Sequence, residues 1–483
     1  MSGLEGNESL WSRTVALPRR ERLTRNRVVD VAVIGAGMAG VLIAHQLSQR
    51  GLKTLVLEAR RVGGGQTRNT TAKITSQHGM RCDAMIRKFG EARARQCVSA
   101  NEQAIAAYAE LIQAQGIDCD FVRMPAYLYT AGNAEPLRRE AEAARRLGAD
   151  AHFVSQVGLP VAATAAVRFD GQAQFHPLKF LRAVAGDLEI YEDTPALSVD
   201  GHHIATPGGE VRADRIVFAA HYPFVNVPGW YFLRMHQERS YVLALRSSWL
   251  PEGIYYGVDA DGLSFRQAEG LLLLGGGGHR TGENSTGGRY EKLLEQARAL
   301  SPGCQEVARW SAQDCITLDG LPYIGSFAAS TPDWYVATGF AKWGMTTSMA
   351  AALSIAGQIC GDAPEWAAAF DPARFSLSAS AQSLATDAVQ AVKGLARDFL
   401  AVPRETLDAL PVGHGGIVEV DGRKAGVYRD ELGHSHVVNP RCPHLGCQLE
   451  WNPDERSWDC PCHGSRFDMD GNWINDPAQE GLQ

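Results

Sequence analysis

The sequence predicts an α/β chain that includes an antiparallel (α+β) part and ends in an all-β module. Three observations support this. Val28–Glu58 has the pattern of a strand, a glycine-rich turn, a helix and a second strand. Residues 237–278 contain runs typical of antiparallel strands, and the composition changes beyond residue 402. The 483 residues allow about three domains.

Val28–Glu58 begins with Val28–Ile34, an apolar, β-branched run broken only by Asp30, as expected of a buried parallel strand. The turn after it has the pattern G-x-G-x-x-G, with glycines at Gly35, Gly37 and Gly40. In this pattern the first glycine permits a tight turn and the second lets a pyrophosphate approach the backbone. The third lets the helix pack on the sheet.

The predicted helix Ala39–Arg50 would aim its free N–H groups and positive dipole end at that pyrophosphate. The next strand, Leu52–Leu57, ends in Glu58, whose carboxylate can accept both ribose hydroxyls. The order of elements predicts a bound adenine dinucleotide, whereas the glycines alone would fit an ordinary turn. The carboxylate disfavours NADP. Cofactor contacts are expected from Gly35, Ala36, Gly37, Met38, Ala39, Gly40, Glu58, Ala59 and Arg60.

Composition describes a soluble globular chain, with 45% hydrophobic residues and a net charge of −7. It is not basic enough to indicate nucleic-acid binding, and no apolar run has the length of a membrane span. Pro18–Arg22 has a weak similarity to a twin-arginine signal, but the dinucleotide strand with Asp30 follows it instead of a removable apolar stretch. We therefore expect a cytoplasmic protein.

The ten cysteines fall into two groups. One group is scattered, as expected of reduced thiols: Cys82, Cys97, Cys119, Cys304, Cys315 and Cys360. The other is crowded near the C-terminus, which indicates chemistry rather than scaffolding: Cys442, Cys447, Cys460 and Cys462.

A loop rich in small and hydroxyl residues, 63–75, follows the ribose acid. It could be a flexible surface loop, but its position favours contact with the second phosphate and the inner half of a cofactor. The expected contacts are Thr67, Thr70, Thr71, Ala72 and Lys73.

Periodicity predicts further helices and strands along the chain. The helices are expected at Glu91–Gln115, Leu137–Leu147 and Arg289–Leu300. The strands are expected at Leu188–Asp200, Val211–His221, Gln237–Leu245 and Gly270–Gly278, the last two in an antiparallel sheet.

Two later segments also point to the cofactor. Asp319–Gly325 predicts a turn and a short strand, and Asp333–Ala337 predicts a buried strand. The glycine-flanked loop 338–347 then opens the apolar helix Ser348–Cys360, whose N-terminus would stabilise negative charge on a flavin ring. Contacts are expected from Gly339, Gly344, Met345 and Thr346.

The chain from about Ser9 to Ala373 resembles the D-amino-acid oxidase/sarcosine oxidase superfamily. The resemblance rests on GGGQTRNTTAKIT, FHPLKF, DGLPYIG and ATGFAKWGMTTS. It implies a Rossmann-type FAD-binding domain with an antiparallel-sheet substrate domain, and hydride transfer to flavin N5, usually from the carbon next to an amine. Some relatives attach the flavin through a cysteine in the vicinity of Cys315, but the residues around it here differ.

Substrate contacts can be nominated near the predicted ring. His279 and Arg280 follow a glycine-rich strand end, and Arg239 and Tyr241 lie on the neighbouring strand. An arginine could pair with a substrate carboxylate, although a structural salt bridge is the simpler role for either one. The candidate catalytic residues are His279, Lys342, Trp343, Arg239 and Tyr241, of which Lys342 and Trp343 could equally be surface and core residues.

The C-terminal region begins with a serine- and alanine-rich linker, Arg374–Thr386, and an expected helix, Asp387–Phe399. Three short strands are expected at 415–422, 424–430 and 434–439. The expected boundaries are an FAD-binding domain at 28–100, 151–220 and 311–373, a substrate-binding domain at 101–150 and 221–310, a linker at 374–402 and a β-rich module at 403–483.

The strongest signal in the sequence is the pair CPHLGC, from Cys442, and CPCHGS, from Cys460. Their C-x-H and C-x-x-H spacings offer two thiolates and two imidazoles. Structural zinc is the alternative, but zinc fingers normally begin with two cysteines spaced C-x₂₋₄-C. Two cysteines and two histidines are the ligand set of a Rieske [2Fe–2S] cluster, which predicts an all-β Rieske domain.

The module resembles the Rieske proteins of cytochrome bc and b6f complexes. That resemblance implies the ligands Cys442, His444, Cys460 and His463, and a disulfide between Cys447 and Cys462. Ser465 matches the serine that hydrogen-bonds a bridging sulfide, and Asp476–Ala478 matches the proline loop over the cluster. Phe467 replaces a tyrosine of the high-potential members, so we expect a lower potential. No mononuclear iron domain follows, so oxygenase chemistry of the Rieske type is not expected.

A flavin holds two electrons and a Rieske cluster passes one at a time. We therefore expect an oxidoreductase in which an amine or amino-acid-like substrate reduces FAD and the cluster passes electrons to a carrier protein. One alternative is an oxidase that uses O₂ directly, with Lys342 stabilising superoxide. Another is an electron-transfer component whose flavin serves a partner protein.

Overall fold

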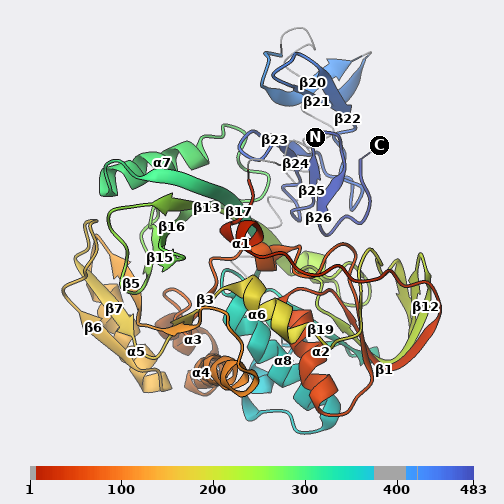
Figure 1. Cartoon of the computed structure of the whole chain (residues 1–483), viewed down its shortest axis with the longest axis horizontal. Coiled ribbons are helices and arrows are strands. Elements are labelled where there is room, and N and C mark those ends of the chain that lie inside the picture. Colours follow the sequence, from red (N-terminus) through yellow and green to blue (C-terminus); the bar gives the residue numbers. More distant parts are fainter. Residues whose placement is uncertain (1–6, 375–409, 421, 483) are drawn as a thin grey trace.

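The computed structural model describes residues 7–374, 410–420 and 422–482 (Figure 1). Its first sheet is centred on β1 (Arg27–Ile34), which pairs in parallel with β12 (Gly209–Phe218) and β2 (Thr54–Leu57). Parallel pairing continues to β9 (Ile190–Tyr191) beside β2 and to β19 (Thr331–Thr338) beside β12. Antiparallel strands complete the sheet: β10 (Ser198–Asp200), β11 (His203–Thr206) and β18 (Tyr323–Ala328).

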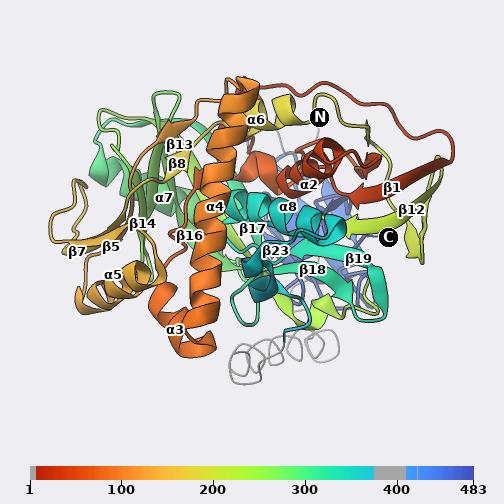
Figure 2. The same ribbon diagram turned by 90° about the horizontal axis from the view of Figure 1, so that it is seen from below.

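Helices cover this sheet, and their buried side chains form a hydrophobic core with it. α2 (Met38–Gln49) packs on α8 (Gly344–Cys360), and the long α4 (Glu91–Gln115) runs past α8 on its other side (Figure 2). Most residues of α2 and α8 are buried. The remaining helical elements of this part are α1 (Leu10–Thr14), α3 (Cys82–Phe89), α6 (Pro177–Val184), η1 (Gln66–Asn69), η2 (Tyr231–Leu233) and η3 (Glu365–Phe370).

The second large sheet is mostly antiparallel and has the order β17-β13-β16-β15-β14-β5-β7-β6. Its strands are β5 (Ala126–Thr130), β6 (Ala151–Val154), β7 (Ala165–Phe169), β13 (Met235–Arg246), β14 (Ile254–Gly257), β15 (Ser264–Ala268), β16 (Leu271–Arg280) and β17 (Gln305–Thr317). α7 (Arg289–Leu300) packs on β13 and β16, and α5 (Glu135–Leu147) packs on β6 and β7. Three short strands form a separate small sheet in the order β3 (Lys73–Ile74), β8 (Ala173–Gln174) and β4 (Val122–Arg123).

The C-terminal module consists of two small antiparallel sheets. One is β20 (Gly415–Val420), β21 (Arg423–Arg429) and β22 (Ser435–Val438). The other is β23 (Glu450–Asn452), β24 (Ser457–Asp459), β25 (Arg466–Asp468) and β26 (Trp473–Asn475). Figure 1 shows this second sheet next to the β13–β17 edge of the large sheet. In the described part of the chain, no helix combines the length and apolarity that a membrane span needs.

The structure differs from the expected elements in two regions. The helix expected at Ser348–Cys360 begins earlier, at Gly344, so the loop before it is shorter than expected. The expected strand Leu188–Asp200 is two short strands, β9 and β10, separated by a loop. Glu192 in that loop is buried, and its carboxylate accepts hydrogen bonds from Arg61, from the Val62 N–H at 2.8 Å and from the Arg20 N–H at 3.0 Å. These partners are distant in sequence, and they hold the loop out of the sheet.

Sheet membership also bears on the domain boundaries. β6 and β7 belong to the second sheet, although residues 151–169 were expected in the FAD-binding domain, and β17 joins that sheet from residue 305. We therefore propose to assign 151–169 and 311–317 to the substrate-binding domain, which already included 305–310. The expected helix Asp387–Phe399 and most of the linker lie outside the described residues.

Candidate functional site

A cavity of about 1200 Å³ extends from the carboxyl ends of β1 and β2 to the second sheet and to the C-terminal module. Most of the predicted cofactor contacts line it: Gly35, Gly37, Met38, Ala39, Glu58, Ala59, Arg60, Thr67, Thr70, Thr71, Lys73, Gly339, Gly344 and Met345. Ala36, Gly40, Ala72 and Thr346 do not line it directly. One continuous cavity thus joins sites predicted from segments distant in sequence.

The glycine-rich turn depends on close backbone approaches. Gly35 has φ +105°, and a Cβ there would lie 2.7 Å from the Ala219 carbonyl oxygen. A Cβ on Gly40 would lie 1.8 Å from the Gly35 carbonyl oxygen, so the third glycine is required for packing, as predicted. A Cβ on Gly37 would meet only the Thr67 hydroxyl, at 3.4 Å. The open side of Gly37 leaves room for a pyrophosphate at the start of α2.

Glu58 lies at the end of β2 as predicted. Its carboxylate accepts hydrogen bonds from the Ala36 N–H at 2.8 Å and the Arg60 N–H at 2.9 Å. Burial raises the pKa of Glu58, and these two N–H donors oppose the rise. A carboxylate accepts more than two hydrogen bonds, so it keeps capacity on the cavity side for two ribose hydroxyls.

The hydroxyl-rich loop lies on the cavity and is tied to its surroundings. Thr67 Oγ1 accepts from the Met38 N–H at 2.9 Å, which fixes the loop to the first turn of α2. Thr346 Oγ1 accepts from the Thr75 N–H at 2.9 Å, which fixes it to the first turn of α8. Lys73 is hydrogen-bonded to Ser264, and burial, together with the Arg266 charge, lowers the pKa of Lys73 to about 7. The cofactor role expected of this loop fits these contacts better than a free surface loop does.

The loop before α8 closes the cavity where a flavin ring is expected. Thr338 Oγ1 donates to the His221 carbonyl at 2.6 Å, and the Ala341 N–H donates to the Cys315 carbonyl at 2.9 Å. The Trp343 ring stacks on His78, with ring centroids 4.9 Å apart, and also contacts Tyr256. Trp343 is thus part of the cavity wall.

Lys342 lies between two carboxylates in this cavity. Its Nζ is 3.1 Å from Glu238 Oε2 and 3.8 Å from Asp314 Oδ2. Hydrogen bonding to His236 and the nearby Lys342 charge lower the pKa of Glu238 to about 2, whereas burial raises the pKa of Asp314 to about 6. Sequence reasoning missed both acids, because they meet only through the register in which Glu238 of β13 faces Asp314 of β17.

Two other nominated residues, Arg239 and Tyr241, are engaged at the interface with the C-terminal module, and His279 contacts Tyr241. Arg239 is buried and its guanidinium lies 2.8 Å from Glu455 of that module. The Tyr241 hydroxyl is 3.0 Å from His279 Nε2, and it accepts a hydrogen bond from Asn284, which also donates to Asp454 at 2.8 Å. Their contacts therefore suit domain docking better than substrate binding.

The two segments that carry the predicted cluster ligands, 442–447 and 460–465, are called the cluster loops, and they share one backbone arrangement. In the first, the Cys442 N–H donates to the Cys447 carbonyl and the Gly446 N–H to the Cys442 carbonyl, each at 2.9 Å. In the second, the Cys460 N–H donates to the Ser465 carbonyl at 2.8 Å, and the Gly464 N–H donates to the Cys460 carbonyl at 2.9 Å. Gly446 and Gly464 have φ +78° and +86°. Glycine four residues after the first cysteine of each loop was a further signal in the sequence.

The four predicted ligands converge between these loops. The His444 and His463 rings lie 5.0 Å apart at a right angle, and Cys442 and Cys460 are both buried. The neighbouring Cys460 thiol lowers the pKa of Cys442. His444 Nδ1 is buried and lacks a hydrogen-bond partner among the described residues, while His444 Nε2 lies 3.1 Å from Asn226 Oδ1. Two buried thiols and an imidazole nitrogen left open fit the [2Fe–2S] ligand set.

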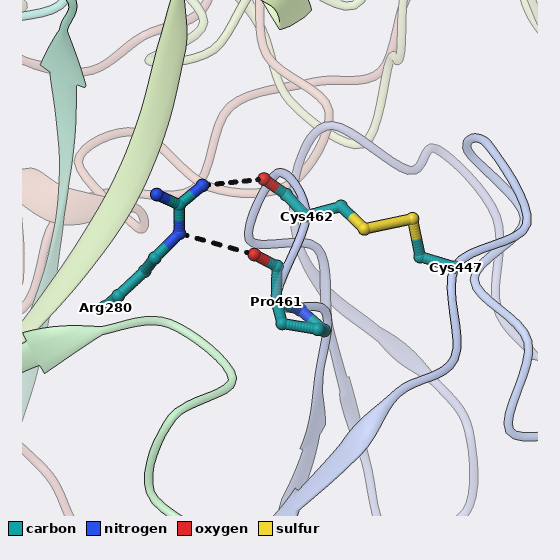
Figure 3. The surroundings of a disulfide bond; sticks show 4 residues. All are labelled: Arg280, Cys447, Pro461 and Cys462. Carbon is teal, nitrogen blue, oxygen red and sulfur yellow. Dashed lines mark hydrogen bonds between the residues drawn. A yellow bond between two sulfur atoms is a disulfide. The ribbon is translucent and has the colours of Figure 1, made fainter. Parts of the chain in front are cut away.

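Cys447 and Cys462 form the disulfide that the resemblance implied. Figure 3 shows Arg280 beside it, with its guanidinium donating to the Pro461 and Cys462 carbonyls at 3.4 Å each. Arg280 therefore links the end of β16 to the second cluster loop. Ser465 Oγ accepts from the Ala478 N–H at 3.0 Å, and Phe467 is fully buried in the same core.

Comparison with known proteins agrees with this division. The family model described as FAD dependent oxidoreductase matches residues 30–358, and the model described as Rieske [2Fe-2S] domain matches residues 405–483. The protein YhfW of Bacillus subtilis (strain 168), which bears the name of a Rieske 2Fe-2S iron-sulfur protein, is 34% identical over 99% of this chain and 97% of its own.

Two partial similarities cover one half each. The cytochrome b6-f complex iron-sulfur subunit 2 of Trichormus variabilis (strain ATCC 29413 / PCC 7937) is 47% identical over 10% of this chain and 26% of its own. Glycine oxidase from Geobacillus kaustophilus superposes with a TM-score of 0.63, at 20% identity, over 72% of this chain and all of that structure. The second similarity shows the fold.

Proposed function

The chain belongs to the FAD dependent oxidoreductase family and carries a Rieske [2Fe-2S] domain, and on this premise we propose the following function. It oxidises an amine or amino-acid-like substrate by hydride transfer to flavin N5, and passes the electrons singly through the cluster to an external carrier protein. One observation carries the proposal. The second cluster loop is fixed to β13, a strand that lines the cavity, because Gln237 Nε2 of β13 donates to the His463 carbonyl at 2.7 Å.

Residues of the first domain would hold and orient the cofactor. Glu58 would accept the ribose hydroxyls, and the first turn of α2 would bind the pyrophosphate. The first turn of α8, which includes Met345, would favour negative charge on the ring. When bound, the flavin accepts a hydride and the cluster carries one electron at a time.

Asp314 is our candidate for the proton acceptor in the cavity. Amine substrates are mostly protonated near neutral pH, and hydride transfer needs the neutral amine. The Asp314 carboxyl lines the cavity, and burial raises its pKa to about 6, close to the value that suits a general base. The Lys342 ammonium, which also pairs with Glu238, lies 3.8 Å from Asp314 Oδ2 and would hold the Asp314 carboxyl in place.

The surface around His444 supports electron exit to a carrier. His444 is only partly buried, whereas the other histidine ligand, His463, is 9% exposed. Large apolar side chains of the two adjoining loops are exposed, and such residues are frequent at the centres of protein interfaces. They are Val227, Trp230, Leu233 and Leu445.

Two alternative functions make different use of the same groups. In an O₂-using oxidase, Lys342 would stabilise superoxide, but its ammonium already lies between Glu238 and Asp314. In an electron-transfer component, reductant would enter at the cluster and the flavin would serve a partner protein. Both redox sites lie in one chain, and this arrangement favours the dehydrogenase over the two alternatives.

Anaerobic titration of the holoenzyme with candidate amines, followed at flavin and cluster absorption bands, separates these functions. The dehydrogenase predicts flavin reduction by an amine, followed by cluster reduction in the same molecule. The oxidase predicts flavin reduction that only O₂ reverses at the turnover rate. Failure of every amine to reduce the flavin, with rapid cluster reduction by a carrier protein, would contradict the proposal and support the electron-transfer component.

A further inference from the structure

One continuous segment, residues 219–239, separates the flavin cavity from the cluster loops. Its beginning, residues 219–221, lines the cavity. Farther along, Asn226 contacts His444, and the Phe232 ring lies edge-on to both histidine ligands, with centroids 6.1 Å from His444 and 5.8 Å from His463. The segment then enters β13, where Gln237 is 2% exposed. It is therefore the common wall of the two sites.

The Gln237 side chain spans this wall. On the cluster side, its Nε2 donates to the His463 carbonyl at 2.7 Å and to the Asp476 carbonyl at 3.0 Å. On the other side its Oε1 lies 3.7 Å from the Cys315 thiol, which in turn lies 3.3 Å from Nε2 of His221, a residue that lines the cavity. A single buried side chain thus contacts a cluster-ligand residue directly and a cavity-lining residue through the Cys315 thiol.

Neighbouring side chains hold Gln237 in one orientation. Gln313 Nε2 donates to Gln237 Oε1 at 2.7 Å and to the Gly464 carbonyl at 2.8 Å. The Cys315 thiol lies 3.7 Å from Gln237 Oε1 and 3.3 Å from His221 Nε2. Burying the carboxamides of Gln237 and Gln313 costs free energy unless their polar atoms form hydrogen bonds. Here each carboxamide donates to a backbone carbonyl of the second cluster loop.

His221 is also held in an unusual conformation. Its φ is +66°, which non-glycine residues rarely adopt, and the hydrogen bond from Thr338 Oγ1 to its carbonyl keeps it there. Strained residues persist where the surroundings over-determine them, and they cluster at functional sites. In this conformation His221 lines the cavity, and its Nε2 lies 3.3 Å from the Cys315 thiol that contacts Gln237.

We propose that Gln237 is the electron bridge between the flavin and the cluster, with His221 on the cavity side and the His463 backbone on the cluster side. This inference rests on the proposed transfer from flavin to cluster. Each passage moves one electron from reduced flavin to oxidised cluster. Two passages, each followed by transfer to a one-electron acceptor protein, empty a flavin that received two electrons from substrate, and the protons go to water.

Light-driven reduction of the flavin in the anaerobic holoenzyme tests the bridge without any substrate. The variants are Gln237→Leu, which removes the bridging amide, and Gln237→Glu, which keeps the shape but loses the donor to His463. Tyr290→Phe is the matched control, because it removes one interdomain hydrogen bond, from Tyr290 to Glu455 at 2.8 Å, away from the bridge.

We expect flavin-to-cluster transfer to slow by roughly tenfold or more in both Gln237 variants, as for loss of a strong contact in a shared network. Flavin content and the cluster's iron content should stay unchanged, and Gln237→Glu should lower the cluster potential. The control should transfer electrons at the wild-type rate. Wild-type transfer in Gln237→Leu, or equal slowing in Tyr290→Phe, would overturn the bridge.

The same experiment separates this inference from the proposed function. If the substrate class is wrong, amines will not reduce the flavin, but light-driven transfer will still depend on Gln237. If flavin and cluster exchange no electrons in the wild-type protein either, the proposed function itself fails. Should Gln237→Leu not fold, Gln237→Glu and the cluster potential decide the question.

Discussion

Glu58 lies where a single carboxylate would serve both the fold and the proposed cofactor. It caps two backbone N–H groups beside the glycine-rich turn and still lines the cavity. Its place was predictable because strand, turn and helix follow one another in the sequence. The pairing of Glu238 with Asp314 was not, because it depends on the register of two strands about 70 residues apart.

Changing Glu58 to Gln keeps the side-chain shape but removes the charge that would accept two ribose hydroxyls. The loss should be roughly 1–3 kcal/mol if both bonds weaken. We expect FAD to wash out more readily on gel filtration, while the cluster's visible spectrum is retained as an internal control. Unchanged FAD retention would show that Glu58 does not bind the ribose.

Asp314 should make flavin reduction depend on pH. Burial raises its pKa to about 6, so it is neutral below that pH and can accept a proton only above it. The anaerobic rate of flavin reduction by substrate should therefore rise as pH increases through about 6. Asp314→Asn should lower the rate at pH 7 by about 10²-fold and remove this step. A step that persists at the same pH in the variant would exclude Asp314 as its source.

At the scale of elements, sequence patterns predicted the bounds of those helices whose ends depend on neighbouring residues alone. The helices Glu91–Gln115 and Arg289–Leu300 have the predicted bounds, because their periodicity and flanking glycines are local signals. The expected strand Leu188–Asp200 was wrong in extent, because buried Glu192 binds partners far away in sequence. The interdomain pair Arg239–Glu455 was equally beyond sequence patterns, although a structural salt bridge was the simpler expectation for Arg239.

The disulfide between the cluster loops should stabilise the Rieske domain. Cys447 and Cys462 are 15 residues apart, and closing a loop of this length contributes about 3 kcal/mol in the chain-entropy model. The double variant Cys447→Ser, Cys462→Ser should lose its cluster at a lower temperature, while FAD fluorescence reports an unchanged first domain. Equal thermal loss of the cluster in variant and wild type would contradict a stabilising role.

At the scale of the whole molecule, two cofactor sites share one wall, and both cofactors follow from the families matched. Purified protein should be yellow-brown and contain one FAD and two irons per chain, as a [2Fe–2S] cluster requires. Metal analysis and acid-labile sulfide check this. One zinc without labile sulfide would contradict the cluster, since the same ligand types also suit zinc.

The central claim is that electrons from the flavin leave through the cluster, and His463→Cys tests it most directly. Three thiolates and one imidazole would make the cluster more negative and harder to reduce, while the flavin lies in a separate domain. We predict that substrate still reduces the flavin at the wild-type rate, and that turnover with a one-electron acceptor protein is abolished or greatly slowed. Normal turnover of this variant with O₂ and with every carrier tried would contradict the claim and favour the oxidase.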